Sequence, residues 1–432
     1  MPLIMPFDRQ LLTFGREETH GDYNFLAISK TASSKHNRLD HASFLAKVEV
    51  RPSKKHGRGL FAAADLMAGD VVMVDKAFLV AFSSDKEAET YTVLNLNTNS
   101  GAVGTQATLT FSLTQKMLHN PAAAAKYFNL YDGGYEPKCK PAIVDGVTVI
   151  DTFQAAAIRE YNAFGSPNLR STDKPQASEM ESDPRSASGV WLTASYVNHA
   201  CASNAIRSYI GDLMIVRATK DIAKGTEITM PYHAVEMDPV ETCKVLQKAW
   251  KFKCDCELCI VEAKTVGSDL AQRRQLVREG QAFLTSNRQS ALARPGLTTI
   301  AKAQRLYDQL KATYDEKLFE NMPRLGLIDL GLWLLSAQPQ NGNTKIVIDR
   351  AIEVLRSCGY GIKLKGRKLE VDRSHCYMHS GAMDAAMHAA HAHYFKGDMV
   401  VGRKFEEFGK ELYVTRGGTL MGFVERYGGG DD

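Results

Sequence analysis

The sequence CDCELC at residues 254–259 places three thiols within six positions. Thiols packed this closely are poorly placed to form disulfides with one another. Thiolates are, however, good ligands for zinc, which prefers four ligands in a tetrahedral arrangement. The segment therefore predicts three of the four ligands of a zinc ion, and the fourth has to come from elsewhere in the chain.

The other five cysteines are scattered, and Cys201 is distinctive because it ends the sequence YVNHAC. It lies 53 residues before Cys254, which leaves room for several strands and a helix. A free cysteine is also commonly a buried core thiol. The spacing alone therefore leaves both interpretations of Cys201 open.

Four ordered motifs resemble those of the SET-domain methyltransferases. They are HGRGLFA at 56–62, NHAC at 198–201, GTEITMPY at 225–232 and CDCELC at 254–259. The resemblance implies that Cys201 joins Cys254, Cys256 and Cys259 around one structural zinc ion. Longer stretches, such as IGDLMIVRATKDIAKGTEI at 210–228, are similar to fungal SET proteins of the tetratricopeptide type, which are relatives of the SET-and-MYND group.

Two departures from the family pattern stand out. No cysteine cluster for a MYND finger occurs between Ala62 and Val190, where Cys139 is the only cysteine. Ser203 in NHACASN replaces a proline that is usual in the family. No 34-residue period is found either, so regular tetratricopeptide repeats are not predicted.

The resemblance also implies a binding site for S-adenosylmethionine. Glycines in the first motif would let the backbone approach the cofactor closely, although an isolated GRG sequence is more often a simple turn. A histidine or phenylalanine is likewise more often a core residue, so the roles depend on the motifs around them. The residues assigned to the cofactor are Gly57, Arg58, Gly59, Leu60, Asn198, His199 and Phe252.

Methyl transfer from a sulfonium to an amine is an in-line displacement that needs close alignment and a neutral amine. Tyr232 matches the family's essential tyrosine, whose hydroxyl would orient the donor methyl group and the amine. Tyr196 and Trp250 are assigned to the walls of the substrate channel. These assignments predict a protein-lysine methyltransferase that acts on a lysine-containing protein.

Two other functions stay open at this point. A catalytically weak SET module could serve as a scaffold that binds a partner through its C-terminal helices. An enzyme of small-molecule metabolism could use the same cofactor site, because a fold alone does not determine its substrate.

Hydrophobic periodicity predicts where strands and helices lie. VEV, GLFAA and DVVMVD between residues 48 and 75, and later GDLMIV and TEITM, are typical of short strands. Asn120 before Pro121 indicates a helix start within 113–131, and a second helix is expected around 152–164. One helical face is formed by Ile300, Ala303, Tyr307, Leu310 and Tyr314.

These patterns and the resemblance predict an α+β protein. We expect a β-rich SET fold split by a helical insertion, a cysteine-rich zinc-binding post-SET loop and an all-helical C-terminal domain. The expected boundaries are an N-terminal arm at 1–47, SET halves at 48–84 and 190–235, the insertion at 85–189 with a mobile loop near 166–189, the post-SET segment at 236–262 and the helical domain at 263–432.

Composition is that of an ordinary folded protein. The chain has 432 residues, a net charge of +4, and 44% hydrophobic and 24% charged residues, so direct nucleic-acid binding is not expected. The N-terminus does not resemble a signal peptide, and the apolar stretch at 325–337 is too short to span a bilayer. We therefore expect an intracellular protein of the cytoplasm or nucleus, without membrane attachment.

A group of histidines near the C-terminus has spacing found in metal sites. His375 and His379 are four residues apart, and His388 and His391 are three apart. No H-E-x-x-H pattern accompanies them, so we expect a solvated or core helix here rather than a second metal site.

Overall fold

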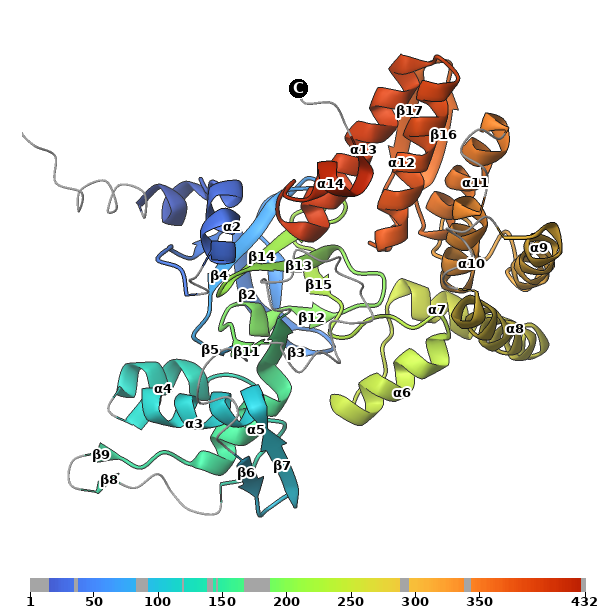
Figure 1. Ribbon diagram of the computed structural model, residues 1–432. Helices are drawn as coiled ribbons and strands as arrows, with labels where there is room; N and C mark the ends of the chain where they lie inside the picture. The colour runs from blue at the N-terminus through green and yellow to red at the C-terminus, as the bar shows by residue number, and fades with distance from the viewer. Residues whose placement is uncertain are drawn as a thin grey trace, which may run out of the picture. The chain divides into compact units, whose positions relative to one another are not determined.

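The computed structural model describes residues 15–34, 38–82, 92–118, 120–137, 143–144, 147–166, 187–287, 295–337 and 343–428. The chain divides into two compact units, and each is described on its own (Figure 1). The first unit holds residues 1–64, 71–198 and 207–216, and the second holds 65–70, 199–206 and 217–432. The division falls inside both predicted SET segments, so the predicted domain boundaries stay a prediction.

The first unit is rich in short strands. Its strands are β1 (Phe44–Leu45), β2 (Val48–Ser53), β3 (Gly57–Ala62), β4 (Val71–Lys76), β5 (Leu79–Ala81), β6 (Thr92–Asn95), β7 (Ser100–Val103), β8 (Ile143–Val144), β9 (Val147–Thr148), β10 (Ala163–Ser166) and β11 (Ala187–Val190), and most of β13 (Ala205–Ile210) and β14 (Leu213–Ala218). Strand order is β1-β4-β14-β13 in one sheet and β10-β11-β5 in another. The strands expected from VEV, GLFAA, DVVMVD and GDLMIV are all present.

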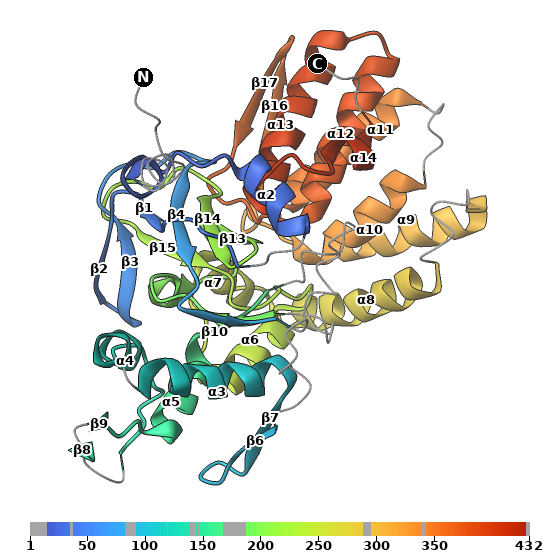
Figure 2. The ribbon, with the colours of Figure 1, turned by 60° about the vertical axis from the view of Figure 1, so that its left-hand side comes forward.

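β2 and β3 form an antiparallel pair that carries the first motif (Figure 2). Val48 lies opposite Ala62, and Ser53 lies opposite Gly57 at the turn. Gly57 has φ +72°, a conformation that suits glycine and strains other residues. The turn glycine of the motif is therefore required by the backbone itself.

The insertion packs three helices, α3 (Gly104–Leu118), α4 (Pro121–Phe128) and α5 (Thr152–Asn162), around a core of its own. Asn120 caps α4 as expected, since its side chain accepts a hydrogen bond from the Ala123 N–H. Asp151 caps α5 in the same way. Tyr127 is fully buried in this core, and its hydroxyl donates to the Ala155 carbonyl at 2.8 Å.

The insertion is not wholly helical, which corrects the prediction. β6 and β7 form a hairpin within it, as do β8 and β9. The sequence TVLN alternates in exposure as a strand does, and Asn99 in the following turn adopts φ +50°. Asparagine tolerates that left-handed conformation better than most residues, which explains the turn.

The predicted loop near 166–189 is shorter at both ends than expected. Ser166 ends β10, and Ala187–Val190 forms β11, a strand whose four residues are all buried between β10 and β5. A Cβ on Gly189 would lie 3.0 Å from the Leu79 carbonyl oxygen, so small residues are needed for this close pairing. The composition ASGV therefore gives no hydrophobic signal although it forms a core strand. Residues 167–186 lie outside the described part of the chain.

The predicted N-terminal arm contains packed structure. Helix α2 (Phe25–Ser34) buries Ile28 and Ala32 in a cluster with Leu39 and Val74. Upstream, Glu17 is buried, lies 2.7 Å from the His41 ring and accepts from the Ala42 N–H. These contacts fix the described part of the arm to the first unit.

The second unit is mostly helical. Its elements are β12 (Asn198–His199, at the division), β15 (Glu227–Met230), α6 (Pro239–Ala249), α7 (Glu257–Ala263), α8 (Gly267–Ser286), α9 (Leu297–Ala312), α10 (Leu325–Ser336), α11 (Thr344–Ser357), β16 (Gly361–Lys365), β17 (Lys368–Asp372), α12 (Ser380–Phe395), α13 (Met399–Gly417) and α14 (Phe423–Tyr427). β15 matches the strand expected from TEITM. None of the described helices combines the length and hydropathy needed to cross a membrane.

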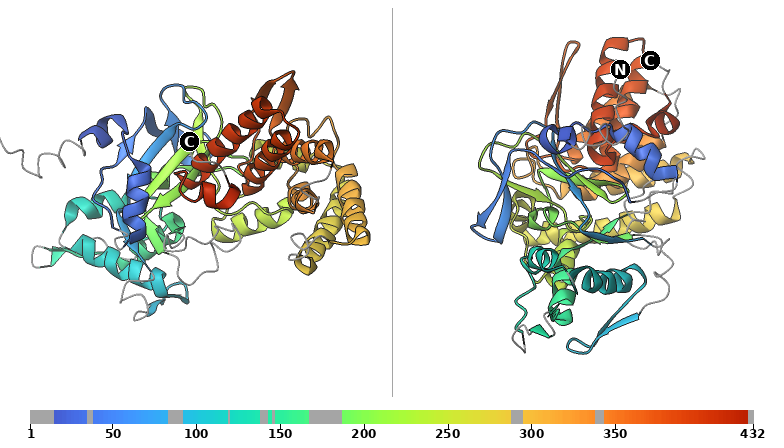
Figure 3. Two further views of the ribbon diagram at one scale, coloured as in Figure 1. Left: turned by 45° about the horizontal axis from the view of Figure 1, so that its top comes forward. Right: turned by 90° about the vertical axis from the view of Figure 1, so that its left-hand side faces the viewer.

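The helices of this unit share one hydrophobic core. On α9, Ala303, Tyr307 and Leu310 are buried along the predicted face, and Tyr314 is buried just beyond the helix end. Cys201, Cys254 and Leu258 belong to the same core. The C-terminal region is not all-helical, however, because β16 and β17 form an antiparallel hairpin beside α12 and α13 (Figure 3). The alternating sequence GIKLK–GR–KLEVD with a glycine turn accounts for that correction.

Candidate active site

Four cysteines of the second unit bring their thiols together. The ligand atoms of Cys201, Cys254, Cys256 and Cys259 all lie within 4.8 Å of one another. Cys201 follows β12, Cys254 and Cys256 lie in the segment before α7, and Cys259 is on the first turn of that helix. The structure therefore assembles the predicted set, and it is the only such group found among the described residues.

The distances fit a single zinc ion. Tetrahedral bonds of about 2.3 Å place neighbouring sulfurs about 3.8 Å apart. The Cys201 sulfur lies 3.9 Å from that of Cys254 and 3.6 Å from that of Cys259. A disulfide would need about 2.05 Å. Hydrogen bonding within the group lowers the pKa of the Cys254 thiol and raises that of the Cys201 thiol.

A fifth thiol, which the sequence did not single out, lies beside this group. Cys243 on α6 interacts with Cys259, and burial raises the pKa of the Cys243 thiol. It is not a member of the four-cysteine group. Cys243 is therefore a neighbour of the metal centre, and it offers a matched comparison for the four ligands.

The turn after Cys201 is held by polar contacts. The buried Ser203, which replaces the family's usual proline, donates from Oγ to the Ala205 carbonyl at 2.9 Å. Asn204 donates to the Glu227 carbonyl at 2.9 Å and accepts from the Thr229 N–H at 2.8 Å. Both of these partners belong to β15, the strand that leads to Tyr232. A serine at this position is therefore compatible with an ordered turn.

His199 connects the cysteine group to Tyr232. Its Nδ1 accepts from the Tyr232 backbone N–H at 3.1 Å, so the ring proton of the neutral imidazole is on Nε2. Nε2 lies 3.3 Å from the Cys201 sulfur and can donate to it. The ring is buried, with 6% of the residue exposed. Outer contacts of this kind orient metal ligands, so one imidazole orients both Cys201 and the backbone of Tyr232.

Four aromatic rings of the second unit lie in contact around Tyr232. The Tyr232 ring lies 5.4 Å from His199, 5.4 Å from Trp250 and 6.3 Å from Phe252, measured between ring centroids. Lys251, between the last two, has φ +62°, an uncommon conformation for a residue with a Cβ. That backbone turn presents Trp250 and Phe252 to the same tyrosine. The four rings form an aromatic cluster beside the four-cysteine group.

The remaining predicted residues lie in the first unit. On β3, Gly57 and Arg58 are exposed, whereas Gly59 and Leu60 are buried. Asn198 donates from Nδ2 to the Arg58 carbonyl oxygen at 3.0 Å, so its side chain is held against the first motif. The structure thus brings the first motif and Asn198 together.

Tyr196 belongs to the same cluster. The Arg58 guanidinium lies 5.1 Å from the Tyr196 ring centroid and donates to the side chain of Asn129 at 3.2 Å. Asn129 in turn donates to the Tyr196 hydroxyl at 3.1 Å. Asn129 comes from the end of α4, and no motif in the sequence indicated it.

Asp75 is a second residue that the sequence did not indicate. One of its carboxylate oxygens accepts from the N–H groups of Thr193 and Ala194 at 2.9 and 3.0 Å. These groups begin the short 3-10 turn Ala194–Tyr196 that precedes Asn198. Burial raises the pKa of Asp75 to about 6. Asp75 therefore anchors the segment that carries Tyr196 and Asn198.

The predicted site residues are divided between the two units. Asn198 ends a segment of the first unit and His199 begins one of the second, so a single peptide bond joins the two groups of residues. The roles assigned to the individual residues stay predictions.

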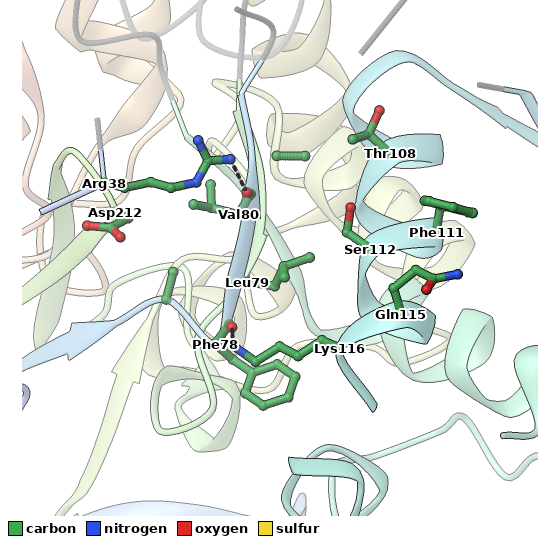
Figure 4. Close-up of a pocket in the computed structure, with 12 residues that line it drawn as sticks. Arg38, Phe78, Leu79, Val80, Thr108, Phe111, Ser112, Gln115, Lys116 and Asp212 are labelled. Atoms are coloured by element: carbon green, nitrogen blue, oxygen red, sulfur yellow. Dashed lines mark hydrogen bonds between the residues drawn. The ribbon is translucent and has the colours of Figure 1, made fainter. Parts of the chain in front are cut away.

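A cavity of about 650 Å³ in the first unit is separate from the predicted residues (Figure 4). It lies between β5, an edge strand, and α3. Lys116 donates to the Phe78 carbonyl at 2.7 Å, and Arg38 donates to the Val80 carbonyl at 3.3 Å. Both cations thus cap the edge of the strand, a common means of blocking further strand pairing.

The C-terminal histidines have separate roles. His379 caps α12 by accepting from the Gly381 N–H, and His375 lies 3.1 Å from Glu257. His393 is buried and stacks on Phe405. Within the described ranges they form no metal group.

Comparison with known proteins agrees with the motifs. Residues 57–233 match the family model of the SET domain. The chain thus contains a SET domain, and its strands, helical insertion and cysteine group fit that fold. Members of the SET-and-MYND group are among its relatives.

Three relatives illustrate the relationship. A protein of Gibberella zeae named "Methyltransferase" is 34% identical over 310 residues, which are 69% of this chain and 41% of that protein. A SET and MYND domain-containing protein of Dictyostelium discoideum is 34% identical over 89 residues, 20% of this chain and 26% of that protein. The human protein-lysine N-methyltransferase SMYD4 is 35% identical over 81 residues, 18% and 10% of the two chains. The match thus covers about two fifths of the length of the first relative and a smaller share of the length of the other two.

A solved structure of the SET domain of LSMT bound to lysine and AdoHcy is also similar. It has a TM-score of 0.31 and 11% identity over 95% of this chain and 93% of that one.

Proposed function

We propose that the chain is an S-adenosylmethionine-dependent methyltransferase of the SET type that methylates lysine side chains of a protein. The observation that best supports the proposal is the arrangement of Tyr232 with His199, Trp250 and Phe252 next to a four-cysteine group. Relatives named protein-lysine and histone-lysine N-methyltransferases support the same class. We also propose that it acts inside the cell.

The residues assigned to donor binding are Gly57, Arg58, Gly59, Leu60, Asn198, His199 and Phe252. When bound, S-adenosylmethionine supplies an electrophilic methyl group for in-line transfer to an amine. The backbone of Gly57–Leu60 is exposed at Gly57, where a Cβ would meet no protein atom within 4 Å. The backbone at the start of β3 is therefore accessible from solvent. The side chain of Asn198 donates to the Arg58 carbonyl and so lies against the first motif.

The second unit would contribute orientation of the amine. A lysine amine must lose its proton before it can attack, and apolar surroundings lower its pKa by disfavouring the charged form. Trp250 offers such surroundings beside Tyr232. The Tyr232 hydroxyl can accept or donate one hydrogen bond to position the reacting groups. The zinc ion, held by four thiolates, would be structural, since it has no open position for substrate.

Transfer of a labelled methyl group tests this proposal. The full chain is incubated with labelled S-adenosylmethionine and a protein extract. A parallel reaction contains the small-molecule fraction of the same extract in place of the protein. We expect label on lysine residues of protein. Label confined to small molecules would overturn the protein substrate, and donor binding without any transfer would favour a non-catalytic module.

A further inference from the structure

The β16–β17 hairpin of the second unit has no part in the proposed methyl transfer. Its strands pair from Gly361↔Asp372 to Lys365↔Lys368 and are joined by the two residues Gly366 and Arg367. Gly366 has φ +58°, and a glycine at the first position is typical of a tight hairpin turn. The hairpin is therefore a defined structural element rather than a loose loop.

The two faces of the hairpin differ in chemistry. Ile362 is buried in the core of the second unit, and Leu369 and Val371 pack against it on the same face. The opposite face carries Lys363 and Glu370, which pair directly, and the pair Lys365 and Lys368. The apolar face packs on the core of the second unit, whereas Lys363, Lys365 and Lys368 are exposed. Figure 2 shows the hairpin beside α13.

The charged face carries three lysines, Lys363, Lys365 and Lys368, and two acids, Glu370 and Asp372. Lys365 and Lys368 lie directly opposite each other, a placement that destabilises a strand pair. Both lie 3.1 Å from Glu370 and are 70% and 71% exposed. Hydrogen bonding from Lys365 lowers the pKa of Glu370, so this acid stays charged and is shared by two lysines.

Three further cations extend the charged face. Lys363 and Arg367 are exposed on the same hairpin. Lys404 on α13 donates to the Arg367 carbonyl at 2.9 Å, which places a cation from a second element beside the turn. The group is called the basic face below; its members are Lys363, Lys365, Arg367, Lys368 and Lys404.

We propose that the basic face binds an extended acidic segment of a partner protein. Residues two apart on a strand face are about 6.7 Å apart. Lys363 and Lys365 have this spacing, and so do alternate carboxylates of an extended peptide. Five cations near two acids, Glu370 and Asp372, leave an excess of positive charge, which gives the charge complementarity that such a segment needs.

Nucleic acid is a poorer match to the same surface. Residues 361–372, all of them described, include no aromatic side chain on which a base could stack, and Arg367 is their only arginine. Stacking and arginine forks are the features that nucleic-acid surfaces commonly add to lysine charge. An acidic peptide needs neither of them.

Fluorescence anisotropy with the full chain tests the proposal. The probe is a labelled peptide of about twelve alternating glutamate and serine residues, long enough to pass along the hairpin strands. Lys365→Gln with Lys368→Gln removes two cations of the basic face. The control, Lys302→Gln with Lys345→Gln, removes two exposed cations from α9 and α11.

We expect the hairpin variant to bind the peptide about tenfold more weakly, with a smaller dependence on salt, and the control to bind like the wild type. Melting temperatures of both variants should stay close to the wild type, since the hairpin variant loses the Lys365–Lys368 repulsion together with two exposed ion pairs to Glu370, each of small energy. Equal loss in both variants, or no binding of the peptide by the wild type, would overturn the proposal. Tighter binding of a single-stranded oligonucleotide that depends on the same two lysines would assign the face to nucleic acid instead.

Discussion

Removing one thiol from the four-cysteine group should remove zinc and destabilise the second unit. Cys201→Ser replaces a thiolate with a hydroxyl, which is a weaker zinc ligand. Structural zinc contributes about 10–16 kcal/mol in small zinc domains, or about 3 kcal/mol for each of four ligands. Losing one ligand's share weakens zinc binding by about a hundredfold. For a unit of roughly 200 residues, a stability loss of at least about 3 kcal/mol lowers the melting temperature by at least about 6 °C. Since Cys201 is 1% exposed, water cannot easily take the place of its sulfur.

Elemental analysis and thermal melting measure both effects on protein purified without chelator. We expect one zinc per wild-type chain and well below one in Cys201→Ser. Cys243→Ser is the matched control, because Cys243 neighbours Cys259 but is outside the four-cysteine group. Full zinc content in Cys201→Ser, or an equal loss in Cys243→Ser, would refute this ligand assignment.

Two further predictions concern residues that hold the site. His199→Phe keeps a ring but removes both the acceptor for the Tyr232 N–H and the donor to Cys201. A competing chelator should therefore extract zinc at least about tenfold faster from the variant than from the wild type. Extraction at the wild-type rate would show that this contact does not hold the zinc site. Asp75 has a pKa near 6 in the folded protein, above its ordinary value of 3.8, so the folded state binds the proton more tightly and stability falls as pH rises between these values. Asp75→Asn should remove this dependence. Between pH 4.5 and pH 7.5, the free energy of unfolding of the variant, measured with denaturant, should rise by about 2 kcal/mol relative to that of the wild type. If the difference between the two free energies stays the same over this range, the cause assigned to the pKa shift is contradicted.

Local signals accounted for much of the fold. The Asn120–Pro121 start of α4 and the short strands of the first unit could be predicted because their determinants lie within a few residues of one another. The cysteine group could be predicted because ligand type and motif spacing restrict the choice, even though Cys201 and Cys254 are 53 residues apart.

Other features depend on contacts that the sequence does not reveal. The buried strand Ala187–Val190 has little hydrophobic character because its neighbours leave room only for small side chains. Asp75 is 118 residues from the N–H of Thr193 that it binds, and Cys243 reaches Cys259 only through the packing of α6. The hairpins within the predicted helical regions were missed because short strands between helices give weak periodicity.

The most direct test of the central claim is the rate of methyl transfer by Tyr232→Phe. The substitution keeps the ring that contacts His199 and Trp250 and removes only the hydroxyl. Donor affinity, measured by calorimetry, should change little, whereas turnover on protein lysine should fall by about a hundredfold, as for loss of one group acting mainly in the transition state. Tyr131→Phe, at an exposed tyrosine, should behave like the wild type. Wild-type turnover in Tyr232→Phe would contradict the account.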